Sequence, residues 1–157
     1  MKNGGPGRFP AREAGFLLVC GLYLIWNIRD LPNAWLHSPF DRWGWLAFCI
    51  WIFPVVFFVF RAGRIFGMAW LWCGVAVTLA GTLLDLHFLK HAGFALACAG
   101  APPVDKGRFR LIFWLVCALC WMPALGWALK GVGPFWVHVA RPLLALISIL
   151  PLLRKAL

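Results

Sequence analysis

Residues 82–102 read TLLDLHFLKHAGFALACAGAP, and this stretch decides how many times we expect the chain to cross a membrane. Its first half carries Asp85, His87, Lys90 and His91, whereas its second half is an unbroken run of small and apolar residues. Ionisable residues cost roughly 2.5–3.5 kcal/mol each at the centre of a membrane helix, so hydropathy alone argues against a span here. The basic residues elsewhere in the chain argue for one.

The composition of the whole chain favours an integral membrane protein. Of 157 residues, 63% are apolar and only 13% are charged, against about 45–50% and about 25% in a typical soluble domain. The net charge of +10 would suit a nucleic-acid-binding protein. The basic residues, however, lie between long apolar runs and not on a polar face, so we expect the lipid bilayer as a partner and no nucleic acid.

Apolar segments near residues 14–28, 43–60, 65–80, 82–102, 111–129 and 135–153 predict an all-α, polytopic transmembrane helical bundle of six spans. If segment 82–102 crosses, ten basic residues fall on the side of the N-terminus, which the positive-inside rule then assigns to the cytoplasm. These residues are Lys2, Arg8, Arg12, Arg61, Arg64, Lys106, Arg108, Arg110, Arg154 and Lys155. If the segment is re-entrant, five spans remain and this bias largely disappears.

The predicted domain organisation follows from these segments. Residues 1–13 are expected to form a basic cytoplasmic tail, and residues 14–157 a single multi-pass transmembrane domain. Both termini would be cytoplasmic, and the location would be a bacterial-type inner membrane.

Ionisable residues inside a membrane are costly and are by default candidates for a functional site. In the six-span topology they share the outer half of the bundle, as a cluster of Asp85, His87, Lys90, His91, His138 and Arg141. We expect Asp85 to pair with Lys90 or Arg141. His87 and His91 are four residues apart and so lie on one face of a helix. Together with His138 they could bind haem or a metal ion, or handle protons.

Other residues within the apolar segments are expected to shape the bundle. Cys117 and Cys120 form a CxxC pair in the middle of a span, where packing explains them better than redox chemistry. Pro123 predicts a kink in the segment 111–129. Small residues such as Gly74 in the segment 65–80 predict a close approach to a neighbouring helix.

The run Ala97-Cys98-Ala99-Gly100 resembles the Ala-Cys-Ser-Gly motif of the exosortase and archaeosortase family of membrane cysteine transpeptidases, in which an arginine and a histidine follow the motif. The resemblance covers four residues and an order of residue types. Ala99 stands where the family has serine, and no Asn-x-x-Arg follows. It implies transpeptidation at Cys98, with His138 and Arg141 as the other candidate catalytic residues.

These observations favour a non-catalytic subunit or accessory factor of a membrane complex, whose partners are other membrane protein subunits or further copies of the chain. Two alternatives remain open. One is a haem-binding, metal-binding or proton-handling protein that uses His87, His91 and His138. The other is the transpeptidase that uses Cys98.

Overall fold

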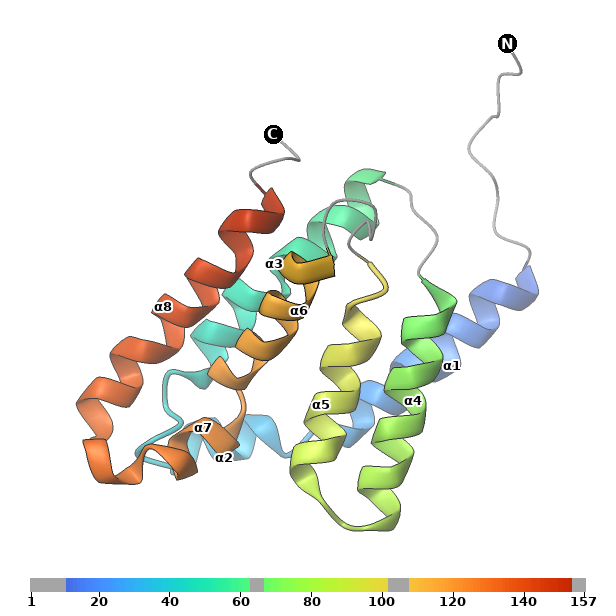
Figure 1. Ribbon diagram of the computed structural model, residues 1–157. Coiled ribbons are helices and arrows are strands. Elements are labelled where there is room, and N and C mark those ends of the chain that lie inside the picture. Colours follow the sequence, from blue (N-terminus) through green and yellow to red (C-terminus); the bar gives the residue numbers. More distant parts are fainter. Residues whose placement is uncertain (1–10, 63–66, 102–107, 154–157) are drawn as a thin grey trace.

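The computed structural model describes residues 11–62, 67–101 and 108–153, and within these ranges the chain is helical (Figure 1). The α-helices are α1 (Ala11–Asn27), α2 (Leu31–His37), α3 (Gly44–Ala62), α4 (Met68–Leu83), α5 (His87–Cys98), α6 (Arg108–Val116), α7 (Pro123–Ala128) and α8 (Pro134–Leu153). Short 3-10 helices cover Cys117–Cys120 and Lys130–Val132. The prediction of an all-helical fold is confirmed for the described residues.

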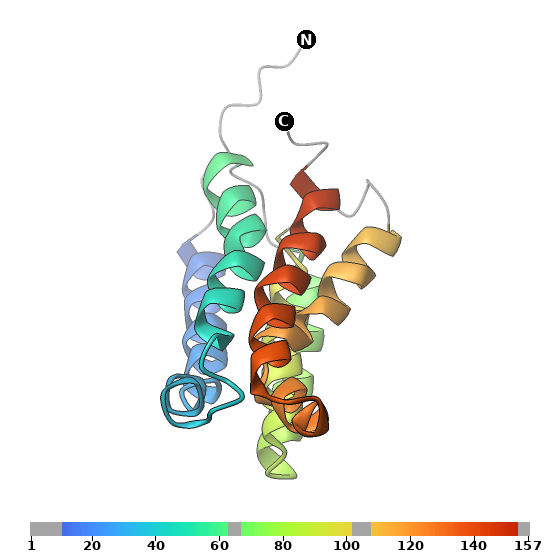
Figure 2. The ribbon, with the colours of Figure 1, turned by 90° about the vertical axis from the view of Figure 1, so that its left-hand side faces the viewer.

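The long helices form two groups that share a core. In one group α4 and α5 pack along each other as a hairpin, with α1 against both; in the other α3 packs along α8, and α6 joins α8. The short helices α2 and α7 contact each other at the end of the molecule where the α4–α5 turn also lies (Figures 1 and 2). This end holds the polar residues discussed below.

The α4–α5 hairpin depends on glycines at the helix contact. A Cβ atom added to Gly74 would lie 2.5 Å from the carbonyl oxygen of Gly93, and one added to Gly93 would meet the side chain of Thr78. The predicted close approach of small residues in this segment is therefore observed. At the turn itself Asp85 has a φ of 51°, a left-handed conformation that Asp adopts more readily than most residues.

Stacked indoles form the centre of the shared core. The rings of Trp51 and Trp114 are parallel, with centroids 4.2 Å apart. Each indole Nε1–H donates a hydrogen bond to the other residue's carbonyl oxygen, at 2.9 and 3.1 Å. Both side chains are fully buried, and Trp121 packs against Trp51 with a centroid distance of 5.5 Å. This pair joins α3 to α6 by packing and by hydrogen bonds that satisfy both indole donors.

The segment 111–129, expected to be one kinked helix, is broken in two. After α6 the backbone tightens into a 3-10 helix, and Met122 is then extended, with φ −76° and ψ 142°. A residue before proline avoids the helical region, and proline is favoured in the first turn of the next helix. Pro123 therefore ends one helical run and begins α7.

None of the helices in the described residues is both long enough and apolar enough to cross a membrane. The prediction of a multi-pass transmembrane bundle with five or six spans is therefore wrong, as are the inner-membrane location and the cytoplasmic termini. The turn at Asp85 leaves α5 with 12 residues, and the break before Pro123 leaves α6 with 9, whereas a span needs roughly 17–25. The predicted tail overlaps α1 at residues 11–13, and residues 1–10 lie outside the described ranges.

Candidate functional site

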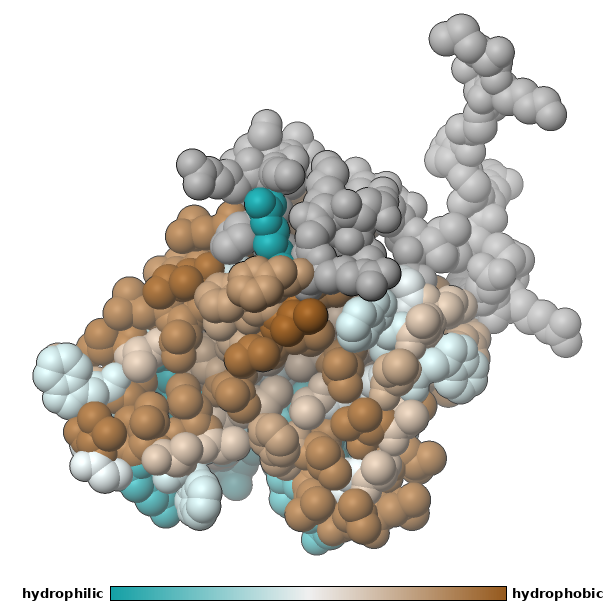
Figure 3. Space-filling model, viewed as in Figure 1, coloured by the Kyte–Doolittle hydropathy of each residue, from teal (hydrophilic) through white to brown (hydrophobic). Residues whose placement is uncertain are grey.

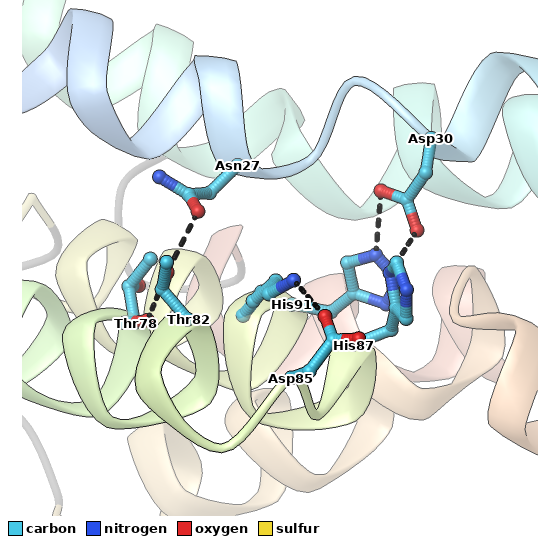
Figure 4. A network of polar contacts seen from close by, with 8 residues as sticks. Asn27, Asp30, Thr78, Thr82, Asp85, His87 and His91 are labelled. Carbon is cyan, nitrogen blue, oxygen red and sulfur yellow. Dashed lines mark hydrogen bonds and ion pairs between the residues drawn. The ribbon is translucent and has the colours of Figure 1, made fainter.

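One carboxylate, that of Asp30, contacts two imidazole rings. The Nδ1 atom of His87 lies 2.9 Å from Asp30 Oδ2, and the Nε2 atom of His91 lies 3.2 Å from Oδ1. Asp30 follows α1 and precedes α2, but its side chain does not cap α2 and turns instead toward α5 (Figure 4). His87 begins α5 and His91 follows one turn later, so the rings reach the carboxylate from the same face of the helix.

Hydrogen bonds between α1 and α4 hold Asp30 in this position. The hydroxyl of Thr82 lies 2.9 Å from Asn27 Oδ1 and donates to that oxygen or to the carbonyl oxygen of Thr78 (Figure 4). Asn27 Nδ2 in turn donates to the carbonyl oxygen of Tyr23, at 2.9 Å. The C-terminal end of α1 is thereby attached to α4, three residues before Asp30.

Burial and charge act in opposite directions on this group. Burial lowers the pKa of His91 below its ordinary value, and the hydrogen bond and charge of Asp30 only partly offset that effect. Burial raises the pKa of Asp30, but the hydrogen bond and charge of His91, with a contribution from His87, outweigh it and leave that pKa below its ordinary value. At neutral pH the group is therefore a carboxylate that accepts N–H bonds from a neutral His91 and from His87.

A pocket of about 510 Å³ opens beside this group, between α2, α5 and α7. His91 forms its buried floor, with a side chain 3% exposed, whereas the side chain of His87 is 60% exposed. Two aromatic side chains flank the opening, Phe88 at 48% and Trp127 at 74% exposure. The full lining is Asp30, Asn33, Ala34, His87, Phe88, His91, Pro123, Ala124 and Trp127.

The predicted polar cluster is divided in the structure. The Nζ atom of Lys90 lies 3.1 Å from Asp85 Oδ1, which is one of the two pairings predicted for Asp85. Neither residue belongs to the lining of the pocket. His138 and Arg141 form a second group on α8, one turn apart. Within the described residues, no hydrogen bond or ion pair joins the second group to the histidines of α5.

Arg141 pairs with Asp41 and not with Asp85. Its guanidinium is completely buried and donates to the Asp41 carboxylate from Nη2. Its remaining bonds go to backbone oxygens: Nε to Phe40 at 3.2 Å, and Nη1 to Cys120 at 2.8 Å and Met122 at 3.2 Å. The carbonyls of Cys120 and Met122 lie just before α7. Arg141 therefore holds the start of the helix that supplies one wall of the pocket.

His138 lies next to this ion pair. Burial lowers the pKa of His138 below its ordinary value, and the charges of Arg141 and Arg42 lower it further. Its Nδ1 atom is buried without a hydrogen-bond partner in the described part of the chain. The structure therefore does not place His138 beside the histidines of α5, which the prediction of one shared ligand required.

Among the described residues, no three His, Cys, Asp or Glu side chains form a group suited to hold a metal ion. His138, the third predicted ligand, contacts the Arg141 group and not the pocket.

Cys98 is a buried thiol at the end of α5 opposite to His87. Burial raises the pKa of Cys98 to about 12. A nucleophilic cysteine instead needs a lowered pKa or an adjacent base, and neither His138 nor Arg141 bonds to Cys98. Cys117 and Cys120 are free, buried thiols in a 3-10 helix, which agrees with a packing role.

Sequence reasoning missed the two carboxylates that organise both groups. Asp30 and Asp41 lie between the predicted spans 14–28 and 43–60, outside the predicted polar cluster. They are two of only five acidic residues in a chain with fifteen basic ones. That scarcity was the available signal, because buried cations require carboxylate partners.

No protein-family model, no curated protein and no solved structure matches this chain. The function is therefore argued from the residues themselves.

Proposed function

We propose that the chain binds a small molecule in the pocket between α2, α5 and α7, and that Asp30, His87 and His91 exchange a proton with it. The observation that carries the proposal is the contact of one carboxylate with two imidazoles at the wall of that pocket. This function develops the proton-handling alternative that the His87 and His91 spacing suggested.

The carboxylate determines which nitrogen of each ring carries a proton. Because His87 Nδ1 and His91 Nε2 face Asp30, these atoms hold the hydrogens in the neutral rings. The Nε2 atom of His87 then has a free lone pair, on a side chain that is largely exposed at the pocket. A carboxylate behind an imidazole stabilises the imidazolium, so His87 is built to accept a proton from a bound group and to return it.

The lining favours binding and proton transfer over covalent catalysis. Its nine residues include no Ser, Thr, Cys or Lys that could act as a nucleophile. His91 is buried and bonds to the Asp30 carboxylate, whereas His87 is exposed and is the ring that contacts the ligand.

Imidazole NMR signals provide the test. A panel of single-ring aromatic amines, alcohols and carboxylic acids is added to the purified chain while the His87, His91 and Trp127 resonances are recorded. The proposal expects at least one fragment to move all three together and to shift the titration of His87. Asp30→Asn should abolish this response, whereas Asp85→Asn, which removes the same charge outside the pocket, should preserve it. A panel that leaves all three signals unchanged would overturn the proposal.

A second candidate function, a subunit of a larger protein assembly, is favoured by the exposed apolar side chains. On α1 Leu22 and Trp26 are 60% and 64% exposed, and α8 exposes Phe135, Leu146 and Leu150. Figure 3 shows apolar residues over much of the visible face. Contiguous apolar patches beyond a few hundred Å² mark interaction surfaces. We propose that other protein chains, or further copies of this one, cover these helices.

Native mass measurement tests the assembly. The proposal expects the purified chain to form an oligomer or to retain a bound protein, and Leu146→Glu to release it. Gly131→Glu, at an open surface position, is the matched control and should leave the mass unchanged. A wild-type chain that is monomeric and carries no other protein argues against a subunit role.

A further inference from the structure

We infer that the molecule bound in this pocket is an organic cation: a protonated amine that carries an apolar or aromatic group. The inference rests on the proposed function and names the class of its ligand. Three properties of the lining support it, namely its carboxylate, its aromatic side chains and its hydrogen-bond acceptors.

The lining carries a net negative charge. Asp30 is its acidic residue, and no Lys or Arg belongs to it. Two cations close to the pocket residues in the chain make other contacts: Lys90 pairs with Asp85 at 3.1 Å, and the Arg29 guanidinium lies 4.1 Å from the centre of the Trp26 ring. The ionised Asp30 carboxylate therefore favours a cation over a carboxylate or phosphate ligand.

Two large aromatic side chains belong to the lining of the pocket. Phe88 lines the pocket from α5, and Trp127 lines it from α7. Both remain substantially exposed although their rings are among the largest apolar groups of the chain. Aromatic faces attract cations within about 6 Å of the ring centre and also cover apolar ligand groups. An amine with an aromatic or alkyl body satisfies both properties at once.

The lining offers several hydrogen-bond acceptors. Each oxygen of Asp30 accepts one imidazole N–H and keeps further lone-pair capacity, and the Nε2 atom of His87 adds another acceptor. The side-chain oxygen of Asn33 is a third. An ammonium group has three donors and no acceptor, so it complements this set, whereas an alcohol donates only one bond.

The groups facing the carboxylate make binding depend on pH. His87 and His91 of α5 contact it directly. Lys90, next to His91 in the chain, pairs with Asp85, Arg29 adjoins Asp30 in the chain, and the Nδ1 atom of His37 lies 3.0 Å from the Asn33 carbonyl oxygen. Helix α7, PALGWA, brings no titratable group. As the pH falls, protonation of an imidazole beside Asp30 offsets the negative charge of that carboxylate. Affinity for a cation should therefore be present at neutral pH and lost under acidic conditions.

The test compares three probes of similar shape: 2-phenylethylammonium, 2-phenylethanol and 3-phenylpropionate. Dissociation constants are measured by calorimetry at about pH 7.5 and about pH 5.5, on either side of the ordinary histidine pKa. At the higher pH we expect the ammonium to bind roughly tenfold more tightly than the alcohol, the effect of one charge-assisted hydrogen bond. The advantage should disappear at the lower pH, and this comparison needs no variant.

Two variants assign the effect to the pocket. Asp30→Asn should remove the preference for the ammonium, whereas Asp85→Asn should retain it; Asn tolerates the left-handed backbone at position 85 as Asp does. Equal or tighter binding of the alcohol or the carboxylate at the higher pH overturns the inference. If those neutral or anionic probes alone move the His87 signal, the proton-exchanging pocket stands and only the ligand class fails. If no probe moves it, both fail.

Discussion

The guanidinium of Arg141 and the carboxylate of Asp41 form an ion pair whose side chains are 0% and 8% exposed. The two residues are 100 positions apart, and the pair joins α8 to the segment between α2 and α3. The same guanidinium binds the carbonyl oxygens of Cys120 and Met122, immediately before Pro123 of the pocket wall. The Arg141–Asp41 pair thus positions α7, which lines one side of the pocket beside Asp30.

Removing one partner of this pair should strongly destabilise the fold. Arg141→Met removes the donors to the buried Asp41 carboxylate and to the carbonyl oxygens of Phe40, Cys120 and Met122, so we expect a loss of about 3–5 kcal/mol in the free energy of unfolding. Chemical denaturation measures it. Asp85→Asn breaks an ion pair in which the carboxylate is 87% exposed, and its cost should be about 0–1 kcal/mol. Equal losses in the two variants would show that burial of the Arg141 pair is not what stabilises the fold.

Gly126 is required where α7 meets this pair. A Cβ atom there would lie 2.5 Å from Asp41 Oδ1 and 2.9 Å from Arg141 Nη2. Gly126→Ala should therefore cost about 1–3 kcal/mol, the range for overpacking, and displace α7. Gly131→Ala adds the same atom to open space and should leave stability nearly unchanged. Thermal unfolding of the two variants compares them directly, and an undisturbed Gly126→Ala protein would contradict the contact.

The stacked indoles of Trp51 and Trp114 should be sensitive to truncation. Trp51→Phe removes one Nε1–H donor and part of the parallel stack, and leaves the carbonyl oxygen of Trp114 without its partner. We expect a loss of about 2–4 kcal/mol from the cavity and the missing hydrogen bond. Trp45→Phe, at a side chain 51% exposed, is the control and should have little effect. Urea denaturation midpoints distinguish the two.

Acid should destabilise the chain through its buried histidines. The folded state lowers the pKa of His91, so above the unfolded value near 6.5 the neutral ring contributes its full stability. As the pH falls below that value, the unfolded chain binds the proton more readily and stability declines. His138 acts in the same direction. Free energies of unfolding measured from pH 7.5 downward should decline less steeply in His91→Gln, and a curve identical to that of the wild type would contradict this linkage.

Alkylation should separate exposed from buried cysteines. Cys49 and Cys73 are exposed, whereas burial raises the pKa of Cys98 and of Cys120 to about 12. Iodoacetamide at neutral pH should therefore modify the first two positions and spare the others until denaturant is added, as followed by peptide mass spectrometry. Rapid modification of Cys98 in the folded chain would instead indicate an activated thiol and support the transpeptidase alternative.

Local patterns of the sequence predicted several features correctly. The helical segments near residues 14–28, 43–60 and 135–153 correspond to α1, α3 and α8 with small shifts at their ends. His87 and His91 lie on one face, and Lys90 pairs with Asp85. All these features involve residues a few positions apart, for which helix periodicity is sufficient.

The membrane prediction failed because composition does not report where helices end. The basic residues elsewhere in the chain favoured a span over 82–102, but Asp85 adopts a left-handed turn and shortens the helix. Pro123 was expected to kink a helix, and instead the extended Met122 separates two short ones. Both breaks depend on backbone conformations that hydropathy averages conceal.

By itself, the sequence determined an apolar, helical chain and the shared face of His87 and His91, and it limited the partner of Asp85 to Lys90 or Arg141. Only the tertiary structure decided that Asp30 meets His91 across 61 residues and that Asp41 meets Arg141 across 100. The physical reason is that helix periodicity acts over one or two turns, whereas a buried charge can be satisfied by any carboxylate that packing brings within hydrogen-bond distance.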